Sequence, residues 1–309
     1  VISSSRLCTQ TNNCAWPMAR QAARSAASAA LLLAGCEAYI CDPSEYYASM
    51  DLQAGALALH AALQTRISSP HNVIPYTASD QTDTWDALSI LDRDPSNPAQ
   101  VIPIYTQRPM TASNLAGQTT GWNREHTWPK SYGVGTSGPD TSDLHMLRAS
   151  DWNVNSARSN LHFDQCDAGC TSPAHAEADP TTAKNSVAFR PPAVVRGDLA
   201  RAMFYMAVRY AGAQTSTNDL RLTSCPCAES FAMGNLSTLL RWHAEDPVDD
   251  AERERSGRVC TAYQGNRNPF VDHPELVARL WNAAMPDPVC ASGCGGGGGR
   301  AAATRGSAG

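Results

Sequence analysis

NREHTWPKSYG at residues 123–133 and DLHMLRASDWNVNSARSN at residues 143–160 are the most informative part of this sequence. A carboxylate and an imidazole are adjacent at Glu125 and His126, and amide and arginine side chains recur through the second stretch. A helix cap accounts for one Asn or Ser, but not for this density. Carboxylate and amide oxygens suit hard cations such as Mg²⁺, Ca²⁺ or Mn²⁺. We therefore expect one hard metal ion, one general base and cationic side chains that bind phosphate.

The segments on either side have mainly helical patterns. Apolar residues recur at helical spacing in several segments that we predict to be helices: residues 46–68, 84–91, 196–211, 231–243 and 273–284. Val101–Tyr105 is expected to form a strand. The chain is thus predicted to be mainly helical, with a short β or irregular middle.

Composition and charge narrow the class of protein. The 309 residues are 42% hydrophobic and 17% charged, which excludes disorder of the whole chain and allows one large domain or two small ones. The formal charge is -5, which is the wrong sign for binding nucleic acid by bulk electrostatics. Any polyanionic partner must be bound locally.

The N-terminal region has the pattern of an export signal. From Met18, a candidate true start, the sequence is MARQAARSAASAALLLAGC, in which two arginines precede an apolar stretch and small residues precede Cys36. That stretch is shorter than the about 20 residues that span a bilayer, and no later segment is long and apolar enough. Leu33-Ala34-Gly35-Cys36 resembles a lipobox, so we expect lipidation of Cys36; the alternative is an ordinary cleaved signal peptide. The protein is expected to be exported, as a periplasmic or cell-surface lipoprotein or as a secreted protein.

The cysteines point to an oxidising compartment. The sequence contains 11 of them, a high count for a cytosolic enzyme of this size. Beyond Cys36 there are eight: Cys41, Cys166, Cys170, Cys225, Cys227, Cys260, Cys290 and Cys294. We expect disulfides whose pairing the sequence does not give. The alternative is a zinc site, since Cys166 and Cys170, and likewise Cys290 and Cys294, have ligand-like spacings.

Three separated blocks resemble a known family. NREHTWPKSYG (123–133), DLHMLRASDWNVNSARSN (143–160) and QGNRNPFVDHPEL (264–276) closely resemble bacterial endonuclease I and its secreted relatives. These are nucleases of the His-Me finger, or ββα-metal, type, and the resemblance extends over about residues 44–288. It implies an α+β fold, a mainly helical domain built around a His-Me finger core.

The residue patterns and the resemblance together suggest a domain organisation. Residues 1–35 would be a leader, and residues 1–17 of it would be present only because the start was misassigned. Residues 36–43 would be a linker in the mature protein. Residues 44–290 would form one nuclease domain. Residues 291–309 are rich in glycine and are expected to be a disordered tail.

The family mechanism implies roles for four residues. His126 would be the general base that takes a proton from the attacking water. Glu125 and Asn155 would bind the metal, which we expect to be Mg²⁺, with Mn²⁺ or Ca²⁺ as alternatives. Arg158 is predicted to bind phosphate as a catalytic residue, the alternative being an ion pair with a carboxylate. The reaction would leave products with a 5′ phosphate.

Other polar residues near this set are predicted to support it. They are expected to bind phosphate or to orient the catalytic groups: Arg124, Asp143, His145, Arg148 and Asn160. Each has an alternative: Arg124 could point away from the site, His145 could be a buried structural histidine, and Arg148 could pair with a carboxylate. Asn160 could be a second metal ligand or a structural hydrogen bonder. The loop Ser131–Ser142 lacks the arginine that some members carry there.

We therefore expect an exported endonuclease that cleaves DNA, RNA or both without reading sequence, as a monomer. Two alternatives remain. One is a catalytically silent nucleic-acid-binding lipoprotein of the same fold. The other is a zinc hydrolase that uses His126, His145 or His162 with cysteines, although no HExxH spacing supports it.

Overall fold

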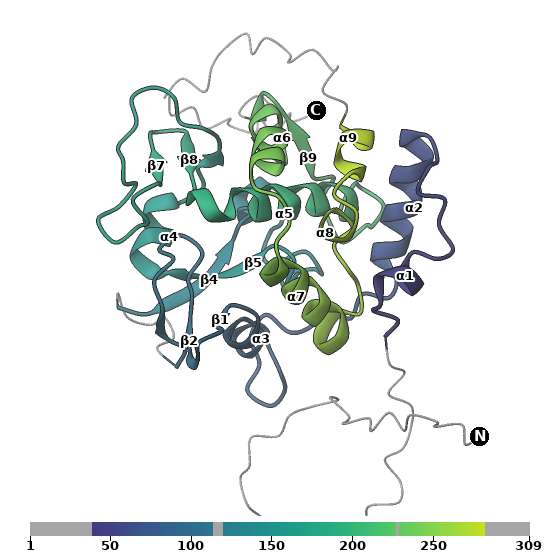
Figure 1. The fold of residues 1–309 in the computed structure, drawn as a ribbon, viewed down its shortest axis with the longest axis horizontal. Helices are drawn as coiled ribbons and strands as arrows, with labels where there is room; N and C mark the ends of the chain where they lie inside the picture. The colour runs from purple at the N-terminus through teal and green to yellow at the C-terminus, as the bar shows by residue number, and fades with distance from the viewer. Residues whose placement is uncertain (1–38, 114–119, 227–228, 282–309) are drawn as a thin grey trace, which may run out of the picture.

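The computed structural model describes residues 39–113, 120–226 and 229–281. Its helices are α1 (Pro43–Tyr46), α2 (Ala56–Ser68), α3 (Thr84–Leu91), α4 (Trp152–Arg158), α5 (Arg196–Arg209), α6 (Leu236–Glu245), α7 (Asp250–Arg258), α8 (Pro269–Asp272) and α9 (Leu276–Leu280). Its strands are β1 (Arg93–Asp94), β2 (Asn97–Val101), β3 (Met110–Thr111), β4 (Trp122–His126), β5 (Leu147–Asp151), β6 (His162–Phe163), β7 (Ala183–Lys184), β8 (Ala188–Arg190), β9 (Arg221–Thr223) and β10 (Ala232–Asn235). Helices and small sheets together confirm the α+β class (Figure 1). None of the helices in the described ranges has the length and apolar character needed to cross a membrane.

Helix α5 forms the centre of the core. Its sequence, RGDLARAMFYMAVR, places buried residues around the whole helix, which is typical of a helix surrounded by protein. Helices α2, α6 and α8 pack against it (Figure 1). The arginines that α5 buries have polar partners: Arg201 forms an ion pair with Glu252 of α7 at 2.6 Å, and Arg209 donates a hydrogen bond to His71 at 3.1 Å. The helices therefore form a rigid base for the smaller β elements.

Strands β4 and β5 pair antiparallel, and α4 follows β5 directly. The register places Glu125 opposite Arg148 and His126 opposite Leu147. Asp151 ends β5 and is also the N-cap of α4, where its carboxylate accepts from the backbone N–H groups of Asn153 and Val154. Such a cap contributes about 1 kcal/mol and fixes the angle at which the helix leaves the strand. The position of α4 relative to β4 is therefore set locally.

The remaining strands form small sheets. One antiparallel sheet has the order β1-β2-β3, and a mixed sheet has the order β6-β8-β7, in which β6 and β8 are parallel. Strands β9 and β10 form a parallel pair. The mixed sheet lies next to the β4-β5-α4 unit, because Lys184 of β7 donates to the backbone oxygen of Ala157 on α4 at 2.9 Å.

The predicted helices are confirmed in part. The helix over residues 84–91 has the predicted bounds, fixed by a capping box between Asp83 and Asp86. The helix predicted over residues 46–68 is confirmed only over α2, Ala56–Ser68, because α1 already ends at Tyr46 and residues 47–55 are not helical. The strand predicted over Val101–Tyr105 is wrong: β2 ends at Val101, and Pro103 cannot donate to a strand ladder.

The C-terminal helical predictions need similar correction. The segment predicted as a helix over residues 231–243 begins as β10, and α6 starts at Leu236. The last predicted helix, over residues 273–284, is shorter, and α9 covers Leu276–Leu280 among the described residues. Helix α7 was not predicted at all.

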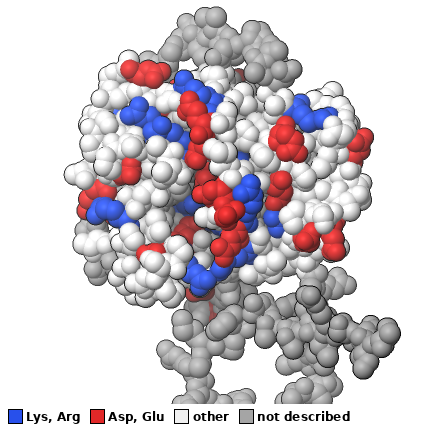
Figure 2. All heavy atoms as spheres, in the orientation of Figure 1, with Lys and Arg blue, Asp and Glu red and all other residues white. Residues whose placement is uncertain are grey.

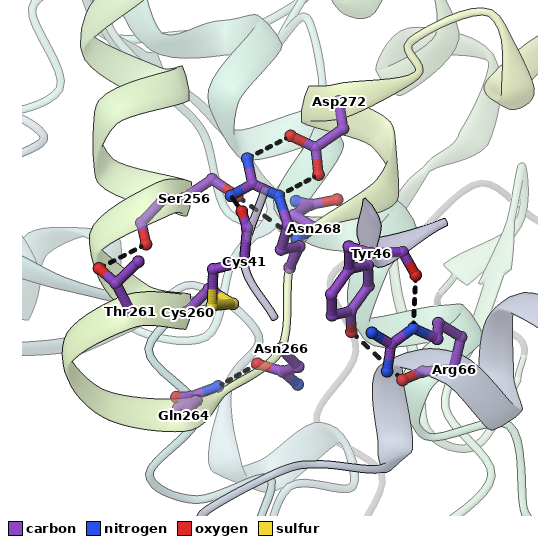
Figure 3. The surroundings of a disulfide bond; sticks show 12 residues. Cys41, Tyr46, Arg66, Ser256, Cys260, Thr261, Gln264, Asn266, Asn268 and Asp272 are labelled. Carbon is purple, nitrogen blue, oxygen red and sulfur yellow. Dashed lines mark hydrogen bonds and ion pairs between the residues drawn. A yellow bond between two sulfur atoms is a disulfide. The ribbon is translucent and has the colours of Figure 1, made fainter. Parts of the chain in front are cut away.

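Two disulfides confirm part of the cysteine interpretation. Cys41 pairs with Cys260 across 219 residues, and Cys166 pairs with Cys170. Figure 3 shows the first bond between the segment before α1 and the helical turn Val259–Gln264 that follows α7. The zinc alternative is therefore wrong for Cys166 and Cys170. Cys290 and Cys294 lie outside the described residues, as do the predicted leader, the lipidation site Cys36 and the glycine-rich tail.

Charged side chains are mixed on the face that carries α6 and α7. Figure 2 shows acidic and basic groups interspersed there, without a broad basic area on this face. This distribution agrees with the negative formal charge of the whole chain. Binding of a polyanion over this face would have to rely on a few local contacts.

Candidate active site

Strand β4 presents polar residues on both of its faces. Alternate residues of a strand point to opposite faces, so Asn123 and Glu125 share one face. Arg124 and His126 share the other. On the first face, the amide of Asn155 on α4 donates to Asn123 Oδ1 at 2.7 Å. The β4-β5-α4 unit thus places Asn155 beside Asn123 and Glu125, whereas His126 follows Glu125 directly and faces the other side of β4.

Glu125 is a buried carboxylate held by fixed donors. Its side chain is almost inaccessible, and Oε1 accepts from the hydroxyl of Tyr105 at 2.8 Å and lies 2.9 Å from Arg158 Nη1. Burial raises the pKa of Glu125, and Arg158, Tyr105 and Asn155 oppose that rise. A desolvated carboxylate of this kind gains from any further cation placed beside it.

Asn155 lies beside Glu125, and a hydrogen bond from its amide is one of the contacts that oppose the rise in the pKa of Glu125. Because its Nδ2 donates to Asn123, its Oδ1 is left as an acceptor, and no described residue donates to it. One carboxylate and one amide oxygen are hard donors, and this set fits Mg²⁺, Mn²⁺ or Ca²⁺ better than a soft metal. Asn123 was not predicted from the sequence as a site residue, although it lies in the same stretch.

His126 is held with one nitrogen free. Its Nε2 lies 2.9 Å from the backbone oxygen of Thr141, and a carbonyl only accepts, so Nε2 carries the proton of the neutral ring. No described residue bonds to Nδ1, which is not among the fully enclosed polar atoms. Burial, and then the charge of Lys130, lower the pKa of His126 to about 3. The ring is therefore neutral at ordinary pH and offers the lone pair of Nδ1 as a base.

The loop that supplies Thr141 depends on glycine. Gly138 has φ +109°, and a Cβ there would lie 2.7 Å from Asp140 Oδ1. Asp140 is itself buried, and neither of its carboxylate oxygens has a hydrogen-bond partner among the described residues. Burial raises its pKa to about 7. The loop thus holds the Thr141 carbonyl against His126. The buried carboxyl group of Asp140 directly precedes Thr141 in this loop.

Two cations lie beside His126, around the ring of Tyr76. The ring centroids of Tyr76 and His126 are 5.4 Å apart, and Lys130 Nζ lies 4.4 Å from the Tyr76 centroid. Arg124 stacks on the same ring and donates to the hydroxyl of Thr84 on α3 at 2.9 Å. Arg124 is therefore tied to α3, whereas Lys130 is half-buried and remains available to a phosphate. Lys130 was missed in the sequence, although it stands four residues after His126.

Arg158 does not lie where a phosphate-binding residue was expected. It is only 1% exposed, and besides Glu125 it donates to the backbone oxygens of His126 at 3.1 Å and Thr127 at 2.8 Å. Its guanidinium also covers the ring of Phe163, at 4.8 Å. These contacts tie α4 to the end of β4 and hold Glu125 in place. The carboxylate pairing considered as its alternative is the one observed, with Glu125 as the partner.

Asp143 and His145 belong to a buried network behind the site. Asp143 Oδ2 accepts from the hydroxyls of Tyr205 and Tyr210, at 2.9 and 2.7 Å. Burial would raise the pKa of Asp143, but neighbouring histidines and these hydrogen bonds outweigh it and lower the pKa. His145 Nε2 lies 3.2 Å from the backbone oxygen of Asn266, and burial lowers its pKa to about 4. Both residues fix the β5 end of the loop to α5.

The side chains of Arg148 and Asn160 form no hydrogen bond or ion pair with the predicted ligands in the described part of the chain, although Arg148 lies opposite Glu125 in the β4-β5 register. Arg148 pairs with Asp92 at 3.3 Å and with Asp198 at 3.7 Å, so the carboxylate alternative is observed. Asn160 is exposed, just beyond the end of α4, and lines a cavity with Tyr132. Neither of the two roles predicted for Asn160 is seen among the described residues.

The three histidines of the zinc alternative do not meet. His126 binds Thr141 and His145 binds Asn266, whereas the ring of His162 stacks on Tyr132. Within residues 39–113, 120–226 and 229–281, no three His, Cys, Asp or Glu side chains converge as metal ligands.

Comparison with known proteins places this arrangement in a family. The family model described as Endonuclease I matches residues 57–275, which include β4, β5 and α4. An extracellular ribonuclease of Bacillus amyloliquefaciens is 40% identical over 242 residues, covering 78% of this chain and 79% of that protein. An extracellular ribonuclease of Bacillus subtilis (strain 168) is 40% identical over 253 residues, covering 81% of this chain and 83% of that protein. The chain belongs to the endonuclease I family.

Proposed function

We propose that the protein is an exported endonuclease that hydrolyses phosphodiester bonds with a divalent metal ion, within a His-Me finger formed by β4, β5 and α4. The single observation that carries the proposal is the state of His126. Its Nε2–H is committed to the Thr141 carbonyl, so Nδ1 is the free base at the edge of a strand that also carries Glu125. Family membership and the two extracellular ribonucleases support nucleic acid as the substrate and export as the destination.

The residues have separate tasks in this mechanism. His126 Nδ1 accepts a proton from the water that attacks phosphorus, and the bond to Thr141 keeps the ring in the required tautomer. Glu125 and Asn155 hold the cation, and Arg158 holds Glu125. When bound, a divalent cation supplies charge that polarises the phosphate and stabilises the leaving oxygen. Hydrolysis that releases the 3′ oxygen leaves a 5′ phosphate on the product.

Substrate range follows from the contacts available near the site. Lys130 is the half-buried cation next to His126, and it can bind a phosphate of either RNA or DNA. The names of the relatives favour RNA as the first substrate to test. Mg²⁺ is the cation we propose, with Mn²⁺ and Ca²⁺ as alternatives that the same oxygen donors would accept.

Cleavage of RNA and of plasmid DNA, with Mg²⁺ and with EDTA, tests this proposal. We expect cleavage with Mg²⁺, loss of cleavage in EDTA, and a 5′ phosphate on every new end. Glu125→Gln should lose cleavage, because the neutral amide binds the cation less tightly. RNA and DNA that stay intact with purified, folded protein would support a silent binding protein instead, and recovery with Zn²⁺ but not Mg²⁺ would support a zinc hydrolase.

The predicted lipid anchor is a separate proposal. It rests on the Leu33-Ala34-Gly35-Cys36 pattern. Cys36→Ser should release the protein from membranes into the soluble fraction, and an unchanged distribution would contradict the anchor.

A further inference from the structure

A cavity of about 240 Å³ lies beside the candidate active site, between the turn after β4 and the β6-β8 strands. Six of the residues that line it are Tyr132, Asn160, Leu161, His162, Val187 and Glu229. It is smaller than the sites of about 300–1,000 Å³ that hold drug-sized molecules, and its size suits a single ring system. We propose that this cavity binds one nucleobase of the strand being cleaved, an inference that rests on the proposed nuclease function.

The wall of the cavity contains a stacked pair of rings. Tyr132 and His162 lie parallel, with ring centroids 4.6 Å apart and planes at 10°. His162 is the inner ring, at 6% exposed, and Tyr132 is only partly buried and forms the outer one. Aromatic side chains presented in this way are what single-stranded nucleic acids stack their bases on.

Polar groups around these rings suit the edge of a base. His162 Nδ1 is enclosed and has no hydrogen-bond partner among the described residues. Burial lowers the pKa of His162 to about 4, so its ring is neutral. Asn160 offers an amide with both donor and acceptor, and Glu229 offers a carboxylate, and both side chains are exposed at the cavity. The base edge would therefore be recognised by Asn160 and Glu229, while the enclosed His162 Nδ1 lies outside its reach.

The cavity and the candidate active site share the turn that follows β4. Lys130 and Tyr132 belong to one 3₁₀ turn, Lys130–Tyr132, so the cation next to His126 and the outer ring of the cavity are two residues apart. On the other side, Arg158 contacts Glu125 and lies near enough to influence the pKa of both Tyr132 and His162. A strand whose phosphate lies at His126 and Lys130 can therefore place a neighbouring base in the cavity.

The carboxylate of Glu229 favours one class of base. It can only accept hydrogen bonds, so it selects an edge that presents N–H groups. Guanine presents two adjacent donors, an imino N–H and an amino group, whereas uracil presents one. We expect the cavity to prefer guanine to uracil.

Binding can be measured without catalysis, which separates this inference from the nuclease proposal. The His126→Ala protein in EDTA would be titrated calorimetrically with guanosine 5′-monophosphate, uridine 5′-monophosphate and ribose 5-phosphate. We expect guanosine 5′-monophosphate to bind at least about tenfold more tightly than ribose 5-phosphate, from base stacking, and more tightly than uridine 5′-monophosphate. Equal affinities for guanosine 5′-monophosphate and ribose 5-phosphate would overturn the proposal.

Substitutions identify the cavity as the site of that binding. Tyr132→Ala should weaken guanosine 5′-monophosphate about tenfold or more, and Tyr132→Phe, which keeps the ring, should restore most of the affinity. Glu229→Gln removes an exposed charge with little risk to folding and should abolish the preference over uridine 5′-monophosphate. Glu254→Gln on α7, also an exposed acid and one that pairs with Arg258 away from the cavity, is the control. Unchanged affinity in both Tyr132→Ala and Glu229→Gln would overturn the assignment.

The same variants extend the test to cleavage. On short RNA, Tyr132→Ala should raise KM more than it lowers kcat, and the loss should be larger than on a phosphodiester without a base, such as bis(p-nitrophenyl) phosphate. Equal losses on both substrates would indicate a general distortion of the site and would contradict base binding. Nucleotide binding without RNA cleavage would support the cavity and refute only the nuclease proposal.

Discussion

Replacing Arg158 with Met tests whether this residue holds Glu125 or binds substrate. The guanidinium is buried and makes contacts with the Glu125 carboxylate and with the backbone oxygens of His126 and Thr127. Removing one partner of a buried ion pair costs about 3–5 kcal/mol, because the other charge stays buried without compensation. We expect Arg158→Met to lower the free energy of unfolding by that amount in EDTA, with no substrate present.

A double-mutant cycle isolates the contact with Glu125. Glu125→Gln removes the charge that Arg158 compensates. Arg158→Met should therefore lower the free energy of unfolding by less in the Glu125→Gln protein than in the native protein. The two carbonyl contacts are still lost there, so a part of the cost remains. We expect a coupling energy of about 1–3 kcal/mol between the two positions. Urea unfolding followed by circular dichroism measures each of the four proteins.

Arg253→Met is the matched control, since Arg253 is exposed and pairs with the exposed Asp250 on α7. An exposed pair of this kind contributes about 0–1 kcal/mol. A coupling energy below about 0.5 kcal/mol between positions 158 and 125 would refute the positioning role. Normal stability of Arg158→Met combined with a raised KM would return Arg158 to the phosphate-binding role predicted from sequence.

Two further predictions concern stability. Burial raises the pKa of Asp140 from 3.8 to about 7, so ionised Asp140 destabilises the folded state, and this loss of stability develops as pH rises from about 4 to 7. Asp140→Asn should therefore raise the free energy of unfolding at pH 8 by at most about 4 kcal/mol. It should have no such effect at pH 4. Thermal unfolding at both pH values measures this, and equal effects at the two would contradict it. Replacing Cys41 and Cys260 with Ala should lower the free energy of unfolding by about 5 kcal/mol, because their bond closes a loop of 219 residues. The same replacement of Cys166 and Cys170, which are four residues apart, should lower it by about 2 kcal/mol. Urea unfolding under non-reducing conditions compares the pairs, and a larger loss from the short loop would contradict the loop-entropy argument.

Local signals in the sequence were sufficient for some elements. Helix α3 was predicted with its observed bounds from the helical spacing of its apolar residues and the turn-rich residues that follow it, and in the structure a capping box between Asp83 and Asp86 fixes its start. The resemblance to endonuclease I pointed to Glu125 and Asn155 as candidate metal ligands and to His126 as the candidate general base, and these residues lie within the β4-β5-α4 unit. In these cases the determining contacts are close in the chain.

Elements fixed by distant contacts were not predictable in the same way. Helix α7 has the sequence DAERERSGR, which lacks an apolar stripe, and it is held by the pairing of Glu252 with Arg201 and of Arg255 with Asp92. The segment predicted as the strand Val101–Tyr105 has its backbone bonded elsewhere, with Ile104 N–H donating to the oxygen of Ala149. The spacing of apolar residues in the sequence does not indicate such contacts between residues that are distant in the chain.

The supporting residues of the site were the least predictable. Tyr105 and Tyr76 reach Glu125 and His126 from 20 and 50 residues away along the chain. The sequence also does not predict which way the Arg158 side chain points, because the side chain could face either solvent or the protein from the same helix. Its burial follows from the packing of α4 against β4, which only the folded structure shows.

The most direct test of the account is the rate of RNA cleavage after removal of the His126 imidazole. Single-turnover cleavage of a labelled RNA in Mg²⁺ would be compared for the native protein, His126→Ala and His175→Ala, the last being a partly exposed histidine outside the site. A general base contributes about 10²–10⁴-fold, so His126→Ala should be at least about 100-fold slower, with partial rescue by added imidazole, while His175→Ala should match the native rate. Cleavage by folded His126→Ala within a few-fold of the native rate would contradict the mechanism.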